Sequence, residues 1–339
     1  KEVMGDVTYE IIGHTLKESV IAVNDVEIPL AEAHEQWEQP LAKIFPVKTE
    51  PITGSPVKIE FNRPFAGKRV GRIARPRVFI PVFPGTNCEY DTARAFEKAG
   101  AEVDIMVVRN LTPAEISESV AEMAKRINQA QILMLAGGFS AGDEPDGSGK
   151  FIAAMFRNPR VKEAVMKHLK ERDGLILGIC NGFQALIKLG LVPYGEITEI
   201  TEESPTLTFN KIGRHISCLA RTKVVSVQSP WFHNMQVGDI HTIAVSHGEG
   251  RFIASPRMIE LLVRQGQIAT QYVDFNGDPS YDIRFNPNGS MEAVEAITSP
   301  DGRVLGKMGH SERMAPYVAV NVPGQKDQPI FAAGVNYFK

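Results

Sequence analysis

A cysteine flanked by two glycines is the feature of this sequence that most clearly indicates chemistry. Residues 174–184 read Gly-Leu-Ile-Leu-Gly-Ile-Cys-Asn-Gly-Phe-Gln, an apolar run of strand length followed at once by a helical pattern. Gly178 and Gly182 allow a sharp turn that leaves Cys180 at its tip, as in a nucleophile elbow with a thiol in place of the hydroxyl. The start of the new helix favours a thiolate. We therefore interpret Cys180 as a nucleophile, the alternative being a buried structural cysteine.

A nucleophilic thiol needs a base, and His310 is the best placed of the eight histidines. Residues 293–297 and 304–308 are predicted strands joined by the turn Ser299-Pro-Asp-Gly302, so His310 should follow a strand end. Glu312 lies two residues on, which in extended backbone points to the same side and can hold the imidazole tautomer. A His-x-Glu triplet alone is more often a solvated loop. Its combination with Cys180 makes it a candidate catalytic pair.

Several motifs in order resemble one known family. Gly178-Ile-Cys-Asn-Gly-Phe-Gln184 with the later His310-x-Glu312 resembles the triad of class I glutamine amidotransferases. Four further stretches resemble the glutaminase domain of phosphoribosylformylglycinamidine synthases, in their long single-chain form: Phe83-Pro-Gly-Thr-Asn-Cys-Glu-Tyr-Asp91, Leu135-Ala-Gly-Gly-Phe-Ser-Ala-Gly-Asp143, Ser246-His-Gly-Glu-Gly250 and Phe285-Asn-Pro-Asn-Gly-Ser290. The resemblance covers roughly residues 76–339. One departure is Ser311, where many amidotransferases carry proline, and it alters neither catalytic group.

The resemblance implies glutamine hydrolysis that supplies ammonia for ATP-dependent conversion of formylglycinamide ribonucleotide to the amidine in purine biosynthesis. Cys180 would attack the amide, His310 would transfer protons and Glu312 would orient His310. Backbone N–H groups of Asn181 and of the Gly138/Phe139 loop would bind the oxyanion, although Gly137-Gly138 could be only a tight turn. Gln184 matches a glutamine-contacting position of the family. His247 and Gly248 are expected to be a second contact, although His247 could be structural.

The remaining cysteines and acidic residues carry weaker signals. We expect Cys88 to be structural, with Thr86 and Asn87 capping the helix that follows it, and Cys218 to be a small core residue in an alternating strand. No His/Cys/Asp/Glu set has metal-ligand spacing, so no metal is expected, and Asp143-Glu144-Pro-Asp146 fits a solvated face. No cofactor is expected in this chain. The resemblance implies that ATP and magnesium bind the absent synthase part.

Composition describes an ordinary globular chain. It has 339 residues, 43% hydrophobic and 23% charged, with a net charge of −3 and a sequence pI near 6.3. These values give no reason to expect nucleic acid or an anionic membrane as a partner. Three widely spaced cysteines do not form a disulfide framework and suit a reducing, cytoplasmic compartment.

Three regions are expected along the chain. Residues 1–45 contain a predicted hairpin (20–23 and 26–28) and a helix that Pro40 ends, too small to bury their apolar face. The resemblance implies that they are the last piece of a preceding synthase domain, so the N-terminal synthase portion of the same enzyme would be the partner. Residues 46–75 read as an extended basic linker rich in proline and glycine, with Arg63, Lys68, Arg69, Arg72 and Arg75 as a solvated or docking surface.

Residues 76–339 are expected to form an α/β domain. Continuous apolar strands alternate with amphipathic helices up to Gly190, which predicts an open, mostly parallel, flavodoxin-like sheet sandwiched by helices. Beyond Gly190 the pattern becomes antiparallel and β-rich. Cys180, the Gly137-Gly138 loop and His310 all follow strands, so they should converge at the carboxyl ends of the sheet.

Two other functions stay open from the sequence. One is a related cysteine hydrolase of the same fold with another substrate. The other is a non-catalytic docking module that has kept the fold. The presence of an intact cysteine, histidine and glutamate argues against this second function.

Overall fold

The computed structural model of the chain divides into two compact units, Lys1–Lys48 and Thr49–Lys339. It describes residues 5–6, 8–50, 52–67, 73–142 and 148–339. Each unit is considered by itself. The second unit carries all the candidate catalytic residues.

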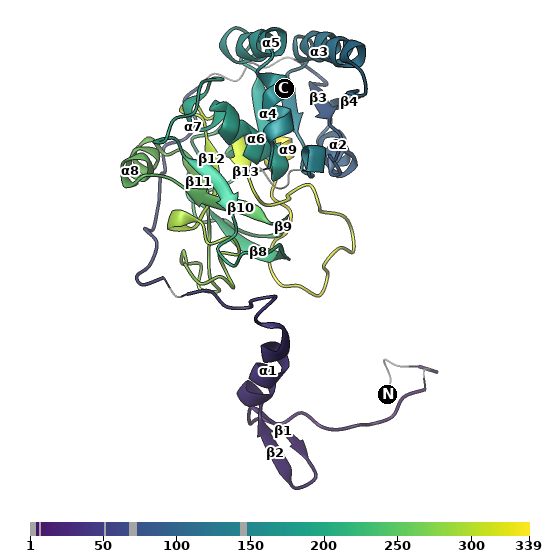
Figure 1. Cartoon of the computed structure of the whole chain (residues 1–339), viewed down its shortest axis with the longest axis vertical. Helices are drawn as coiled ribbons and strands as arrows, with labels where there is room; N and C mark the ends of the chain where they lie inside the picture. Colours follow the sequence, from purple (N-terminus) through teal and green to yellow (C-terminus); the bar gives the residue numbers. More distant parts are fainter. Residues whose placement is uncertain (1–4, 7, 51, 68–72, 143–147) are drawn as a thin grey trace. The chain divides into compact units, whose positions relative to one another are not determined.

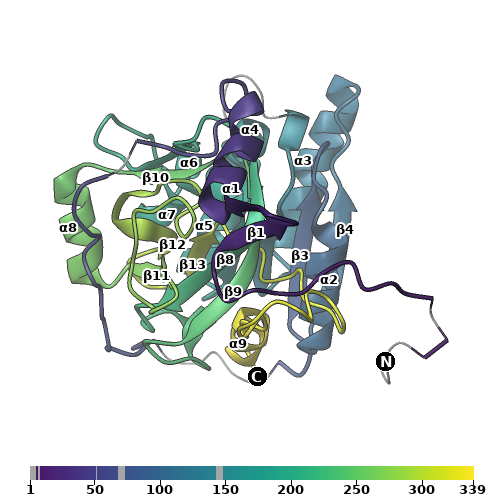
Figure 2. The same ribbon diagram turned by 90° about the horizontal axis from the view of Figure 1, so that it is seen from below.

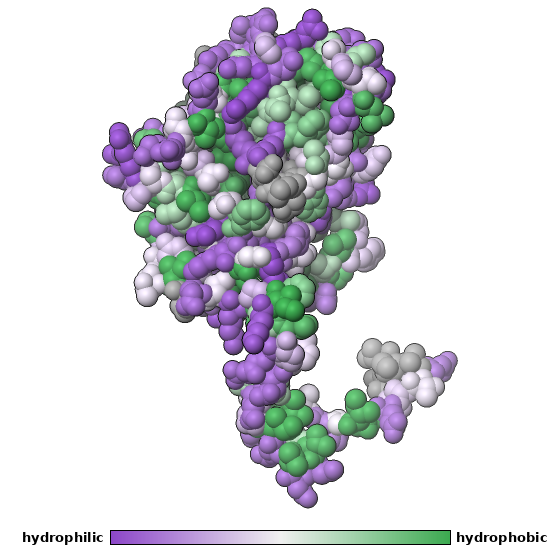
Figure 3. All heavy atoms as spheres, in the orientation of Figure 1, coloured by the Kyte–Doolittle hydropathy of each residue, from purple (hydrophilic) through white to green (hydrophobic). Residues whose placement is uncertain are grey.

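The first unit is a hairpin followed by a short helix (Figure 1). Strands β1 (Val20–Val23) and β2 (Val26–Pro29) pair antiparallel, and α1 (Leu30–Glu38) passes into a 3₁₀ turn (Gln39–Leu41) at Pro40. The predicted hairpin and helix end are therefore confirmed. No residue of α1 is buried, and Trp37 is 78% exposed. Figure 3 shows apolar side chains gathered on the hairpin, where Ile21, Val23, Val26 and Ile28 are exposed.

The second unit begins at Thr49, within the segment 46–75 that was expected to be a linker. Residues 52–67 are extended, as predicted, and they pack on the rest of the second unit. Phe61 N–H donates to the Val225 carbonyl at 2.8 Å, and Pro56 and Ile59 are buried. Apolar side chains in this proline-rich segment explain why it adheres. The expected basic residues Lys68, Arg69 and Arg72 lie outside the described residues.

A nine-stranded sheet forms the centre of the second unit, in the order β4-β3-β5-β6-β13-β12-β11-β8-β9. The first five strands in this order, from β4 through β13, pair in parallel. From β13 onward, each strand pairs antiparallel with the next. The parallel strands are β3 (Arg77–Val82), β4 (Glu102–Val107), β5 (Ile132–Leu135), β6 (Leu175–Ile179) and β13 (Val304–Lys307). The antiparallel strands are β8 (Ile216–Val224), β9 (Ile240–His247), β11 (Ile268–Tyr272) and β12 (Val294–Thr298), and β7 (Thr206–Phe209) pairs with β10 (Glu249–Ile253) separately.

Helices cover both faces of the parallel part, as the apolar strands require. On one side α3 packs against α5 and α4 against α6, and on the other α2 packs against α9 (Figure 2). The helices are α2 (Glu89–Lys98), α3 (Pro113–Ile127), α4 (Lys150–Phe156), α5 (Pro159–Lys170), α6 (Asn181–Leu189), α7 (Leu191–Tyr194), α8 (Pro256–Gln265) and α9 (Ile330–Asn336). The predicted α/β class and the change to antiparallel pairing after Gly190 are confirmed.

Two local expectations are wrong. The cap of α2 is Cys88, without a side-chain cap bond, because the amides of Asn87 and Cys88 both donate to the Gly137 carbonyl at 3.2 Å and fix the chain there. The Thr86 hydroxyl instead accepts from the Phe83 amide at 3.1 Å. Cys218 is exposed rather than in the core, because near the start of β8 three successive residues, 217–219, are exposed on both faces of the strand.

Among the helices that the structure describes, none is long and apolar enough to cross a membrane.

Candidate active site

Cys180 lies at the junction of β6 and α6 with an unusual backbone conformation. Its φ of 52° and ψ of −106° are disfavoured for a residue with a side chain. The flanking glycines provide close approach rather than positive φ. A Cβ on Gly182 would lie 2.0 Å from the Leu135 carbonyl oxygen, and one on Gly178 would lie 2.7 Å from the Gly182 carbonyl. The predicted elbow is therefore present, with the strain at the cysteine itself.

The structure brings His310 and Glu312 together beside this elbow. Nδ1 of His310 lies 2.5 Å from Oε1 of Glu312, and both side chains are almost fully buried. Because Nδ1–H is donated to Glu312, Nε2 is the nitrogen left for proton exchange with a thiol. Gly137 lies between the groups: a Cβ there would sit 2.7 Å from Cε1 of His310 and 3.5 Å from Cβ of Cys180.

The charges of this cluster favour an ion pair. Burial lowers the pKa of His310, but the charge of Glu312 and then that of Cys180 outweigh it and raise the pKa well above its ordinary value. Burial raises the pKa of Glu312, and the His310 charge lowers it below its ordinary value overall. The raised pKa favours an imidazolium held by the Glu312 carboxylate, and an imidazolium is a partner that stabilises a thiolate.

Cys88 is a second thiol at the same place, for which the sequence favoured a structural role. Its Sγ lies 3.9 Å from Nδ1 of His310 and accepts from the Arg313 guanidinium at 3.1 Å. Its side chain is almost fully buried, with 1% exposed. The sequence offered one indication of the role of Arg313, which is that it directly follows Glu312.

Cys88, His310 and Glu312 are close enough together to hold a metal ion. The donor set does not fit one, because Glu312 already holds Nδ1 of His310 and the Arg313 cation lies against the Cys88 sulfur. The acidic stretch Asp143-Glu144-Pro-Asp146 lies outside the described residues.

The expected oxyanion donors are only partly available. The Phe139 amide donates to the Gly85 carbonyl at 2.8 Å, so the expectation for Phe139 does not hold in this conformation. Strand-like pairing of this loop with residue 86 is the physical reason. Gly138, with a φ of 151°, stays the candidate on the loop. Asn181 begins α6, where an amide has no intrahelical partner.

Of the expected glutamine contacts, Gln184 and His247 are buried and Gly248 is partly exposed. Gln184 is held internally, donating to the Glu249 carbonyl at 2.6 Å and accepting from the Asn181 side chain at 3.0 Å. Nδ1 of His247 lies 3.0 Å from the Asn210 side-chain oxygen, while its Nε2 is buried without a partner among the described residues. Burial, then the charge of His310, lowers the pKa of His247 to about 3, so it is neutral. Gly248 borders open space, because a Cβ there would meet no atom within 4 Å.

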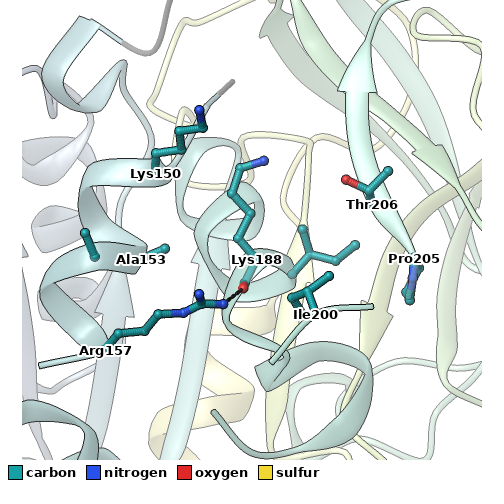
Figure 4. Close-up of a pocket in the computed structure, with 9 residues that line it drawn as sticks. Lys150, Ala153, Arg157, Lys188, Ile200, Pro205 and Thr206 are labelled. Carbon is teal, nitrogen blue, oxygen red and sulfur yellow. Dashed lines mark hydrogen bonds between the residues drawn. The ribbon is translucent and has the colours of Figure 1, made fainter. Parts of the chain in front are cut away.

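A separate hollow of about 570 Å³ lies beside the other end of α6 (Figure 4). Lys150, Arg157 and Lys188 line it together with aliphatic side chains, and Arg157 donates to the Lys188 carbonyl at 2.7 Å. None of the expected catalytic residues lines it, so this hollow is separate from the candidate active site.

Comparison with known proteins shows the family to which the chain belongs. Residues 75–338 match the family of the CobB/CobQ-like glutamine amidotransferase domain. The chain is 32% identical over 248 residues to phosphoribosylformylglycinamidine synthase subunit PurQ of Methanococcus maripaludis, covering 70% of this chain and 82% of that protein. It is 32% identical over 281 residues to the subunit of the same name from Treponema denticola, covering 78% and 99%.

One solved structure, PurLQS from Thermotoga maritima, matches with a TM-score of 0.56 and 26% identity over 78% of this chain and all of that one. The fold and the relatives thus define an enzyme of the glutamine amidotransferase class. The chain belongs to the CobB/CobQ-like glutamine amidotransferase family, in which its named relatives are PurQ subunits.

Proposed function

We propose that this chain hydrolyses glutamine through Cys180, His310 and Glu312, and that the ammonia serves ATP-dependent conversion of formylglycinamide ribonucleotide to formylglycinamidine ribonucleotide. The observation that supports it most is the convergence of these three side chains, from two distant parts of the sequence, at the carboxyl ends of β6 and β13. The names of the PurQ relatives support the choice of synthesis.

The site suggests a two-stage reaction. The Cys180 thiolate attacks the side-chain amide carbon, and the carbonyl electrons move to oxygen, near the amides of Asn181 and Gly138. His310 then protonates the nitrogen from Nε2, the C–N bond breaks and ammonia leaves. Water then attacks the thioester carbon while His310 takes a proton from the water. The bond to sulfur breaks, glutamate is released and the Cys180 thiolate is regenerated.

Glutamine specificity would come from the groups around the elbow. Neutral His247 presents a buried Nε2, unpartnered among the described residues, that can hydrogen-bond the polar end of the substrate, with Gly248 beside it. Gln184 would act mainly by holding α6 against the start of β10, because its amide is bonded at both atoms.

The partner in this proposal is a synthase part, which would bind ATP, magnesium and the ribonucleotide. The exposed apolar hairpin of the first unit supports the idea that residues 1–45 complete such a synthase portion. A reducing, cytoplasmic setting suits the three free thiols.

The other hydrolase of the same fold and the docking module are less well supported. A docking module has no use for a strained cysteine beside a buried His310–Glu312 pair. A different hydrolase would share the elbow, but the family match covers residues 75–338 as a glutamine amidotransferase.

Replacing Cys180 with alanine in the enzyme that contains this chain tests the proposal. We expect glutamine-dependent synthesis to be lost and synthesis from free ammonia to remain, because only the first needs the thiol. Cys218→Ala is the control, since that exposed thiol lies outside the site. Equal loss of both activities would mean that Cys180 is structural.

A further inference from the structure

Two charged residues are fully buried next to the catalytic turn, outside the three groups discussed above. Lys307 ends β13 and Glu295 lies on β12, and both side chains are 0% exposed, with Nζ and Oε1 3.2 Å apart. Burying a charge is costly unless it is paired and hydrogen-bonded. A buried charged pair in this position must therefore be bonded to groups around it.

Both charges are satisfied, and their partners belong to the turn that carries His310. The Lys307 ammonium has three acceptors, matching its three protons: Glu295, the Gly309 carbonyl at 2.6 Å and the Ser311 hydroxyl at 3.0 Å. Glu295 accepts from the Gly309 amide at 2.7 Å and, through its other oxygen, from the Thr270 hydroxyl. The pair thus binds Gly309 from both sides.

These bonds fix the peptide group that leads into His310. Its carbonyl, on Gly309, accepts from Lys307, and its N–H, on His310, donates to the Ala244 carbonyl at 2.8 Å. With both groups bonded, the plane of this peptide is set, and the bond from the ring to Glu312 then sets the direction of the His310 side chain. The approach is so close that a Cβ on Gly309 would lie 3.0 Å from Glu295 and 3.2 Å from Lys307.

Lys307 also contacts the nucleophile. Its carbonyl accepts from the Cys180 amide at 2.8 Å, so one residue holds the cysteine by its backbone and the histidine turn by its side chain. Ser311 extends the network by donating to Gln328 at 2.6 Å while accepting from Lys307. A proline at position 311 could make neither bond.

We propose that the Lys307–Glu295 pair, with Ser311, is a positioning device that aligns His310 with Cys180 for proton transfer. The inference rests on the proposed function, because it assigns the pair a role through His310. The competing explanation is that the pair only stabilises the fold. The two differ in what happens when both charges are removed together, since replacing a whole buried pair by neutral side chains is often tolerated while removing one partner is not.

The test is the double variant Glu295→Gln with Lys307→Met, in the enzyme that contains this chain. We expect a folded protein with KM for glutamine within about threefold of the parent and a kcat of glutamine hydrolysis ~10- to 100-fold lower, as for a slight misplacement of a catalytic group. Synthesis from ammonia should not change. The matched control is Asp104→Asn with Arg126→Met, which removes a 2.6 Å ion pair between β4 and α3 and should leave kcat unchanged.

The rate of Cys180 alkylation by iodoacetamide at neutral pH, followed by peptide mapping, gives a readout that a purely structural role would not move. Loss of alignment with His310 should lower this rate in the double variant. A folded double variant with the parent kcat and alkylation rate would overturn the inference. If the double variant does not fold, Ser311→Ala and Ser311→Thr are compared instead. We expect Ser311→Thr, which keeps the hydroxyl, to keep the parent kcat and Ser311→Ala to lose it. Equal kcat values for the two variants would overturn the inference.

Cys180→Ala, measured in parallel, separates the two failures. If it retained glutamine hydrolysis, the proposed function itself would fail. If it lost hydrolysis while the Lys307 and Ser311 variants behaved like the parent, only the positioning role would be wrong.

Discussion

In the proposed reaction, His310 depends on its neighbours for the charge that it needs. Burial alone would leave His310 neutral, and Glu312 reverses that by raising the pKa of the imidazole well above its ordinary value. Cys88 and Arg313 add a second thiol and a permanent cation within reach. Their presence means that selectivity for Cys180 must come from its place at the elbow, and not from being the only thiol near a base.

Glu312→Gln tests this electrostatic role at the scale of one residue. Without the carboxylate the pKa of His310 falls, so the imidazolium that protonates the leaving nitrogen is lost at lower pH. We expect kcat/KM for glutamine to drop by ~10²–10⁴-fold and its alkaline limb to move to lower pH. Glu163→Gln, on an exposed ion pair of α5, is the control. An unchanged pH–rate profile would contradict the role of Glu312.

At the scale of elements, the junction of β6 with α6 depends on clearance between backbones. Gly182→Ala would place a methyl group 2.0 Å from the Leu135 carbonyl oxygen, so β5 or α6 must shift. We expect a loss of about 1–3 kcal/mol of unfolding free energy together with reduced glutaminase activity. Gly13→Ala, which meets nothing within 4 Å, should change stability by less than about 0.5 kcal/mol. Thermal unfolding of both variants gives the comparison, and equal stability would show that the junction has room to spare.

The strands and helices also show which parts of the fold and of the site could be predicted from the sequence. Strand and helix periods predicted the parallel half of the sheet, and strand ends located Cys180 and His310, because these features are local. The proximity of Cys88 to His310 could not be predicted, because it arises when the residues before α2 bond the loop after β5. The burial of Glu295 and Lys307 could not be predicted from the sequence either. Charged residues in strands usually face solvent, and here antiparallel pairing of β12 with β13 brings them together inside the sheet.

At the scale of the whole molecule, the loop after β5 suggests that the glutaminase is not fully organised when alone. The Phe139 amide is bonded to Gly85 and so cannot serve the oxyanion in this conformation. We expect this chain alone to release glutamate ~10²–10³-fold more slowly per site than the complete enzyme with nucleotide and ribonucleotide bound, the typical effect of one missing oxyanion donor. Glutamate release by the two preparations measures this. Equal turnover would mean that the loop is already in its active arrangement and that the synthase part does not control it.

The central claim, that Cys180 is the nucleophile for glutamine, is tested most directly by covalent trapping. The complete enzyme is incubated with a diazo-ketone analogue of glutamine, and the modified peptide is mapped by mass spectrometry. We predict one adduct, on Cys180, that excess glutamine prevents and that Cys180→Ala abolishes, while Cys88→Ala leaves it in place. A protected adduct on Cys88, or labelling mainly of the exposed Cys218, would contradict the assignment.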